Sequence, residues 1–435
     1  MRTSGFSGAV SLMRRLIAAT LGVCCLLGLS IAALGTPSSA RADGGAPNVA
    51  YVVGGGGDSG DLTAIDIAQR QMTWRMHVGG DPRAVLLSVD SRFAYIAQAG
   101  AAAVAVVDTH AEKVVATIPV GRSPSALALD IGTTGDLFVA NTGSASVTVI
   151  DPQTQRALAT VPVGQQPTGL AVAGAGSGIA NTSDAEVYVA NSGSDTISVL
   201  SATRRATIAT IPAPGGPQSV VIPAAGGIAY VGTRAGSVLA LSLSDHRLLG
   251  TLLRLRGSAA GLMDYDVVTG QVYVPDQAGG MVDVLRPASA GSGGAPANLP
   301  GEPARALPFD GGPIAVAITF DGAFGFVAEH DAGRVVMFDV AAHHTLATVT
   351  IGGSPRAIIT GAYPPILSQQ AAGIVGVLLY VVIGVILLVV IVFYLRYAQR
   401  MQARASSASA GAKPTSGAGE ASGAGDSDGT KGERG

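Results

Sequence analysis

Glutamate, histidine and aspartate follow one another at Glu329-His330-Asp331, the densest group of chemically capable side chains in the middle of the chain. Imidazole and carboxylate groups bind divalent metals and exchange protons, so the group suggests a metal site or an acid–base pair. However, the chain has only six histidines, and none has the spacing of a helical zinc motif. We therefore interpret His330 as a solvated loop residue, and we predict no metal, no cofactor and no catalytic residue.

A second candidate site consists of the residues that end seven similar apolar runs, among them FAYIAQ, DLFVAN and QVYVPD. If the runs are equivalent strands, their last residues form a polar ring at one end of the fold, where a ligand or partner can bind. The alternative is that Asn and Asp at these points form turns with their own backbone. Five of these end residues are predicted to bind a ligand, and two residues of adjoining turns, His330 and Arg356, are added to them. The predicted binding residues are therefore Gln98, Asn141, Asn191, Asp276, Glu329, His330 and Arg356.

Aspartates end a second set of runs, at Asp66, Asp108, Asp151 and Asp339. Four carboxylates could indicate catalysis, but their equivalent positions place them in separate repeats, too far apart for an acid–base pair. Aspartate accepts hydrogen bonds from backbone N–H groups two or three residues later, which stabilises turns. We therefore predict that these residues form turns.

The elements that position these side chains form an internal repeat. One aromatic residue in each of the seven runs recurs about every 43 residues, the usual length of a four-stranded propeller blade. Within residues 124–163 the stretches SALALD, DLFVAN, SVTVID and ALATVPV alternate in hydrophobicity and are separated by turn residues, as four half-buried strands would be. The predicted fold is an all-β, seven-bladed β-propeller over residues 43–361, with four strands in each blade. The aromatic residues are Tyr51, Tyr95, Phe138, Tyr188, Tyr230, Tyr273 and Phe326.

Closure of the ring is also predicted by the repeat. The first copy begins at its second strand, and a last opening motif, GGSPRAIITG, follows the final outer strand. Residues 356–360 should therefore supply the missing inner strand of the first blade. Pairing the two ends of the domain removes an exposed sheet edge.

The repeats VANTGSASVTVID and VANSGSDTISVL, with the openers VGRSP, VGQQP and IGGSP, resemble the YVTN-type β-propeller family. The resemblance extends over residues 48–361 and implies the propeller fold. It implies little about function, because that family includes surface proteins, binding proteins and a few relatives of enzymes.

Both ends of the chain carry an apolar segment. Residues 1–42 combine early arginines, an apolar stretch and Ala-Arg-Ala, and we predict a secretory signal, with an uncleaved anchor as the alternative. Residues 362–371 form a linker, and residues 372–395 are long and apolar enough for a transmembrane helix. Arg396, Arg400 and Arg404 then place the tail, residues 396–435, in the cytoplasm, and its Ser/Gly/Ala-rich composition predicts disorder.

These features predict a single-pass membrane protein with a monomeric propeller on the extracytoplasmic side. A net charge of −2 argues against a nucleic-acid partner. We favour a non-catalytic binding scaffold for a protein or a cell-envelope ligand. The alternatives are a propeller enzyme, such as a lactonase-like hydrolase or a quinoprotein-like dehydrogenase, and a structural envelope protein. The short linker predicts that the insertions at residues 173–184 and 287–304 face the membrane, and that the polar ring faces away.

Overall fold

A computed structural model describes residues 49–55, 60–173, 184–224, 227–257, 259–288 and 303–361, together with residues 396–397 and 399–400. The chain divides into two units, Met1–Pro365 and Ile366–Gly435. The predicted signal, linker and transmembrane segments, and most of both insertions, lie outside the described residues. In the tail, Arg396, Tyr397, Gln399 and Arg400 are helical, so the predicted disorder does not include these four. Within the described part, no helix has the length and hydrophobicity needed to span a bilayer.

The first unit contains seven four-stranded antiparallel sheets, which confirms the predicted seven-bladed β-propeller. Each sheet is named as a blade, and its strands are given from the innermost outward. Blade 1 is β28(Pro355–Thr360), β1(Val49–Gly54), β2(Asp61–Asp66) and β3(Gln71–His77); blade 2 is β4(Pro82–Leu87), β5(Phe93–Gln98), β6(Ala103–Asp108) and β7(Lys113–Pro119). Blade 3 is β8(Pro124–Leu129), β9(Leu137–Asn141), β10(Ser146–Asp151) and β11(Arg156–Pro162); blade 4 is β12(Pro167–Ala173), β13(Glu186–Asn191), β14(Thr196–Ser201) and β15(Ala206–Pro212).

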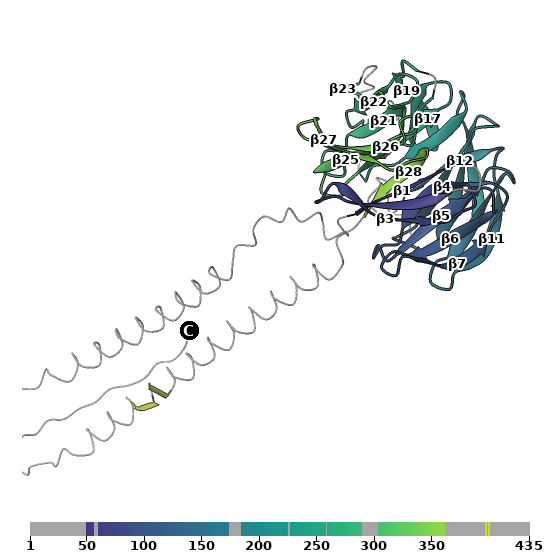
Figure 1. Cartoon of the computed structure of the whole chain (residues 1–435). Coiled ribbons are helices and arrows are strands. Elements are labelled where there is room, and N and C mark those ends of the chain that lie inside the picture. The colour runs from purple at the N-terminus through teal and green to yellow at the C-terminus, as the bar shows by residue number, and fades with distance from the viewer. Residues whose placement is uncertain are drawn as a thin grey trace, which may run out of the picture. The chain divides into compact units, whose positions relative to one another are not determined.

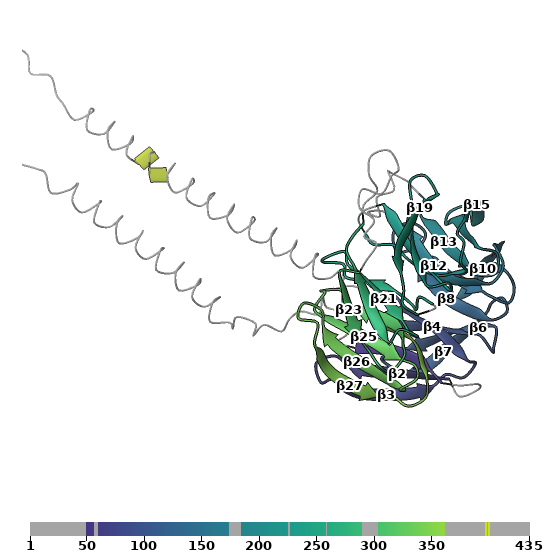
Figure 2. The ribbon, with the colours of Figure 1, turned by 90° about the horizontal axis from the view of Figure 1, so that it is seen from above.

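The remaining blades follow the same order. Blade 5 is β16(Pro217–Val221), β17(Ile228–Thr233), β18(Ser237–Ser242) and β19(Arg247–Arg254); blade 6 is β20(Asp264–Tyr265), β21(Val272–Asp276), β22(Met281–Leu285) and β23(Arg305–Pro308). Blade 7 is β24(Pro313–Ile318), β25(Phe324–Glu329), β26(Arg334–Asp339) and β27(Thr345–Thr350). Figure 2 shows β4, β8 and β12 along the middle of the domain, with β6 and β10 further out.

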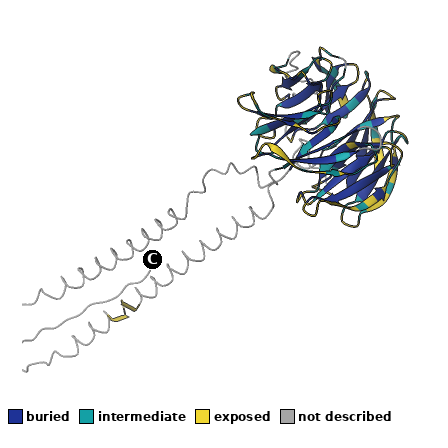
Figure 3. Ribbon diagram, in the orientation of Figure 1, coloured by how far each residue is buried: buried dark blue, intermediate teal, exposed yellow. Residues whose placement is uncertain are grey.

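Burial explains why each blade needs its neighbours. The second and third strands are almost wholly buried, whereas the outer strands of blades 1 to 4 expose most of their residues (Figure 3). The aromatic residues that marked the repeat are all buried, and some join two blades. Tyr230 of blade 5 accepts a hydrogen bond through its hydroxyl from the Ala288 N–H that follows β22 of blade 6, 2.6 Å away. A blade alone would leave these surfaces in water, so the sheets are stable only as a ring.

The ring closes through the predicted pairing of its two ends. Strand β28 lies antiparallel to β1, with Ala50 opposite Thr360 and Val53 opposite Ala357. In Figure 1 these strands, one from each end of the colour scale, lie side by side.

Blade 6 departs from the repeat. Its inner strand β20 has only two residues, because the preceding segment forms a single bridge to β21, at Ala260, and then pairs with the neighbouring blade. Leu262 forms a parallel bridge with Ala315 of blade 7, and its N–H donates to the Ile314 carbonyl at 2.8 Å. A Cβ atom on Gly261 would lie 2.3 Å from that same carbonyl oxygen, so only glycine allows the bridge. The bridge places Leu262 in the central channel.

Candidate functional site

A β-bulge at the start of the inner strand turns one side chain per blade toward the channel. In the six blades whose inner strand opens with proline, the ladder skips the residue after that proline, for example between Pro82 and Ala84. A bulged residue has no partner in the ladder, so its side chain is free to point elsewhere. We call these residues, with Gly261 at the matching position of blade 6, the bulge row. The row is Arg356, Arg83, Ser125, Thr168, Gln218, Gly261 and Ile314, and all seven line one cavity.

This cavity, which we call the outer chamber, has a volume of about 450 Å³. Its charged side comes from blades 7, 1 and 2. The Arg83 Nη2 atom lies 2.7 Å from Asp81 Oδ2, and the Arg356 Nη1 atom lies 3.2 Å from Asp81 Oδ1. Burial, followed by the nearby positive charge of Arg83, lowers the pKa of Arg356 below its ordinary value. One carboxylate therefore serves two guanidinium groups, which leaves a local excess of positive charge.

His330 completes the charged side. Its Nδ1 atom lies 3.0 Å from the Pro355 carbonyl oxygen, which can only accept a hydrogen bond. The hydrogen bond therefore fixes a proton on Nδ1 of the ring. The expectation of a solvated loop histidine was wrong, because His330 is half-buried and lines the outer chamber.

The opposite side of the outer chamber carries hydroxyl groups from blades 3, 4 and 5. The Ser125 hydroxyl already donates to the Pro167 carbonyl at 3.1 Å. By contrast, Thr168 Oγ1 and Ser219 Oγ are buried and find no hydrogen-bond partner within the described residues, and the same holds for Arg356 Nε. Buried polar atoms without partners are rare in folded proteins and call for an explanation. Both residues line the outer chamber, so a molecule bound there can be a hydrogen-bond partner for their hydroxyl groups.

Beyond the bulge row lies a second cavity, the inner chamber, with a volume of about 560 Å³. The two chambers adjoin, because Ser125, Thr168, Ser219 and Leu262 line both. The residues two positions after the bulge row line this chamber, and they also belong to or pack against the hydrophobic clusters of the blades. We call them the aliphatic row, which comprises Val85, Leu127, Leu170, Val220, Met263, Val316 and Ile358.

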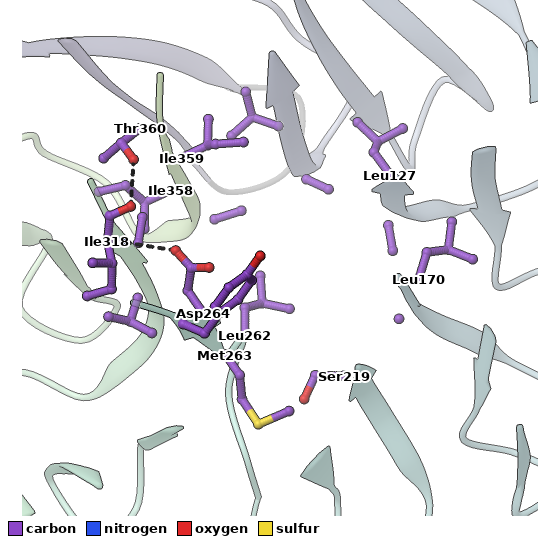
Figure 4. Close-up of a pocket in the computed structure, with 18 of the residues that line it drawn as sticks. Leu127, Leu170, Ser219, Leu262, Met263, Asp264, Ile318, Ile358, Ile359 and Thr360 are labelled. Carbon is purple, nitrogen blue, oxygen red and sulfur yellow. Dashed lines mark hydrogen bonds between the residues drawn. The ribbon is translucent and has the colours of Figure 1, made fainter. Parts of the chain in front are cut away.

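One carboxyl group interrupts this apolar lining. Figure 4 shows Asp264 beside Ile318, across the cavity from Leu127 and Leu170. Its Oδ2 atom accepts a hydrogen bond from the Ile318 N–H at 2.8 Å. Although the channel reaches the side chain, protein surrounds it, and this burial raises the pKa of Asp264 to about 6. The carboxyl group therefore titrates near neutral pH.

Five of the predicted binding residues do not line either chamber. Asn141, Asn191 and Asp276 have no exposed surface, and Glu329 and Gln98 are nearly as buried. The expectation of an exposed polar ring was therefore wrong. Each residue ends its second strand inside the blade, where the adjoining turns cover it.

Their hydrogen bonds show what these buried side chains do. Asn141 Nδ2 donates to Thr148 Oγ1 at 2.9 Å, and Asp276 accepts from the N–H groups of Gly257 and Gly279 at 2.8 and 2.9 Å. Glu329 pairs with Arg334. The two acids accept hydrogen bonds from N–H groups of the turns, as the alternative interpretation expects, whereas the asparagines bind hydroxyl groups of the neighbouring third strand and not their own backbone. The four aspartates of the third strands form turns as predicted; Asp108, for instance, accepts from the N–H groups of His110 and Ala111.

Only Arg356 and His330, of the seven predicted binding residues, lie in the outer chamber. Ser125, Thr168 and Ser219 were not predicted from the sequence. A signal was available, because the openers SPS, QPT, GPQ and SPR share the proline and place a polar residue directly after it. Among the described residues, no three His, Cys, Asp or Glu side chains gather as a metal site requires.

The fold and channel define the class of protein, a seven-bladed β-propeller with a two-chambered channel. Residues 22–189 match the family of YNCE-like β-propellers, and the same repeat continues to β28. This match and the seven blades confirm the predicted resemblance to the YVTN-type β-propellers. No protein of curated function matches it significantly in sequence.

Solved structures with a similar fold share little sequence with this chain. Hydrazine synthase of Kuenenia stuttgartiensis is 20% identical, with a TM-score of 0.55 over 66% of this chain and 90% of its own. A protein of unknown function from Desulfotomaculum acetoxidans is 13% identical, with a TM-score of 0.59 over 73% and 99%. The periplasmic gluconolactonase of Pseudomonas aeruginosa is 17% identical, with a TM-score of 0.55 over 73% and 100%. These likenesses concern the fold alone.

Proposed function

We propose that this protein is a non-catalytic binding module whose ligand occupies the outer chamber. One observation carries the proposal: three residues that line this chamber, Thr168, Ser219 and Arg356, each hold a buried polar atom without a partner among the described residues. An unsatisfied buried polar group costs about 1–3 kcal/mol, which a bound ligand can recover. The volume of about 450 Å³ also suits a small molecule.

The test is a thermal-shift measurement on the full chain in detergent. Glucose, sorbitol, gluconate, citrate, glutamate and spermidine are each added in excess, because a ligand of the folded state raises the melting temperature. We expect at least one compound to stabilise the protein, and to lose that effect in the double variant Thr168→Val/Ser219→Ala. An equal shift in both proteins, or none with any compound, would overturn the proposal.

The absence of catalysis is tested separately. Any compound that binds, and δ-gluconolactone because a gluconolactonase shares the fold, is incubated with the protein and followed by NMR. We expect no conversion above the rate in buffer. Turnover that depends on the protein would make the channel an enzyme site instead.

We further propose that the propeller lies on the extracytoplasmic side of a membrane, tethered by residues 372–395. Support comes from the uncharged apolar sequence of this segment and the arginines that follow it. The only cysteines are Cys24 and Cys25, so both are first replaced by serine. A membrane-impermeant maleimide should then label Lys113→Cys in the propeller of intact cells, but not Ser416→Cys in the tail. The opposite labelling would reverse the orientation.

A further inference from the structure

The two sides of the outer chamber differ in chemistry, and this difference constrains its ligand. In a ring of seven, blade 1 lies opposite blades 4 and 5. Arg356 of blade 1 therefore faces Thr168 and Ser219 across the channel, and Arg83 of blade 2 stands next to Arg356. A ligand that spans the chamber meets guanidinium groups at one end and hydroxyl groups at the other.

The guanidinium side carries one net positive charge, which suits a ligand with one negatively charged group. Arg83 binds Asp81 Oδ2 through both Nε and Nη2, at 3.0 and 2.7 Å. Arg356 reaches Asp81 only through Nη1, and its Nε has no partner in the described part of the chain. Two positive charges against one negative charge leave a net charge of one. Guanidinium groups bind carboxylates through paired, charge-assisted hydrogen bonds, so a carboxylate fits beside Arg356.

The hydroxyl side differs in how firmly each group is held. Ser125 accepts from Thr142 Oγ1 at 2.7 Å and donates to a carbonyl, while the Gln218 amide donates to the Ala260 carbonyl. Thr168 and Ser219 have no such bonds to described residues. A hydroxyl can both donate and accept, so two free hydroxyls match the hydroxyl groups of a ligand better than they match an apolar chain.

Resting on the proposed binding function, we infer that the outer chamber binds a small polyhydroxylated monocarboxylate. Its carboxylate lies at Arg356 and Arg83, and its hydroxyl groups face Thr168 and Ser219. Replacing either arginine leaves Asp81 paired with the other, so these variants should still fold.

Three probes of similar length separate the two ends of the site. D-Gluconate carries both the carboxylate and the hydroxyls, sorbitol carries only hydroxyls, and hexanoate carries only the carboxylate. By calorimetry on the full chain in detergent, we expect gluconate to bind at least tenfold more tightly than sorbitol or hexanoate. Arg356→Gln should reduce gluconate binding to the level of sorbitol. Thr168→Val should weaken gluconate severalfold and leave hexanoate unchanged.

Arg122→Gln is the matched control, because Arg122 is exposed in the same kind of turn but lies outside the outer chamber. It should leave gluconate binding unchanged. Equal binding of sorbitol and gluconate, equal effects of Arg122→Gln and Arg356→Gln, or tighter binding of glucose 6-phosphate than of gluconate would each overturn the inference. A last outcome is that gluconate fails to bind while another compound of the thermal-shift set binds and requires Thr168 and Ser219. In that case the inferred ligand class is wrong, but the proposed binding function stands.

Discussion

The outer and inner chambers are built from the same seven inner strands, yet their linings differ. The bulge row contains two arginines, a serine, a threonine, a glutamine, an isoleucine and a glycine, whereas every member of the aliphatic row is apolar. The two rows lie two residues apart in each strand. A bulged residue leaves the ladder and packs against few neighbours, so its type can vary without loss of the fold. The aliphatic row sits within regular pairing, where core packing selects the residue type.

The largest expected effect comes from removing both rows of blade 1 together. A chain that ends at Ile351 lacks β28, and with it Arg356, Ile358 and the partner of β1. We expect its melting temperature to fall by more than about 10 °C relative to a chain that ends at Ala371, because an open ring exposes a sheet edge and the cores of two blades. Equal melting temperatures would show that the pairing of the two ends does not stabilise the ring.

Buried polar residues next to the outer chamber should contribute far more to the free energy of unfolding than the polar residues that line it. Glu329 is 1% exposed and pairs with Arg334, whose side chain is 34% exposed, so Glu329→Gln should lower the free energy of unfolding by about 1–3 kcal/mol. Asp310 contacts the same Arg334 at 2.7 Å, but its side chain is 95% exposed. Asp310→Asn, the matched control, should therefore cost less than about 1 kcal/mol in urea denaturation. Similar losses in the two variants would contradict a buried structural role for Glu329.

Substituting one isoleucine from each row compares the contributions of the two rows to stability. Ile358 belongs to the aliphatic row and is 8% exposed, while Ile314 belongs to the bulge row and is half-buried. Ile358→Ala should cost about 2–4 kcal/mol of unfolding free energy, because it leaves a cavity among packed side chains. Ile314→Ala should cost clearly less in the same urea titration. If Ile314→Ala were the more damaging change, the bulge row would belong to the core.

Asp264 should make the inner chamber sensitive to pH. Its pKa of about 6 lies above the ordinary 3.8, so the folded protein holds this proton more tightly than the unfolded chain does. Stability should therefore decrease as pH rises from about 4 to about 6, by up to roughly 3 kcal/mol. Asp264→Asn should remove most of this dependence when melting temperatures are compared across that window. Parallel pH profiles for the wild type and the variant would show that Asp264 titrates normally.

The smallest effect is expected in the bulge row itself. Thr168→Val removes a hydroxyl that has no partner among the described residues, and replaces it with a methyl group of similar shape. Unfolding free energy should change by less than about 0.5 kcal/mol, or should rise slightly. A loss of more than about 1 kcal/mol would show that the hydroxyl already has a structural partner, and would weaken the proposed binding site.

The repeat made the fold predictable from sequence, but not the candidate site. Alternating apolar residues and regular turns indicated blade boundaries, and the leftover opener GGSPRAIITG indicated that β28 completes blade 1. The prediction placed binding residues at the ends of second strands because asparagine and acidic residues recur there. These residues are buried and bind turn N–H groups, as Asp276 and Glu329 do, or a third-strand hydroxyl, as Asn141 does, so the same recurrence reflects structural roles within the blades.

The sequence by itself determined the number of blades, their strands and the closure of the ring, because hydrophobic alternation and turn residues are local properties that repeat along the chain. Tertiary structure alone decided which polar residues meet. A bulge at the start of each inner strand turns Arg83, Thr168 and Arg356 into one chamber, although they come from blades 2, 4 and 1. The direction of a side chain depends on strand register and on the curvature of the ring, and neither can be predicted from the spacing of residue types along the chain.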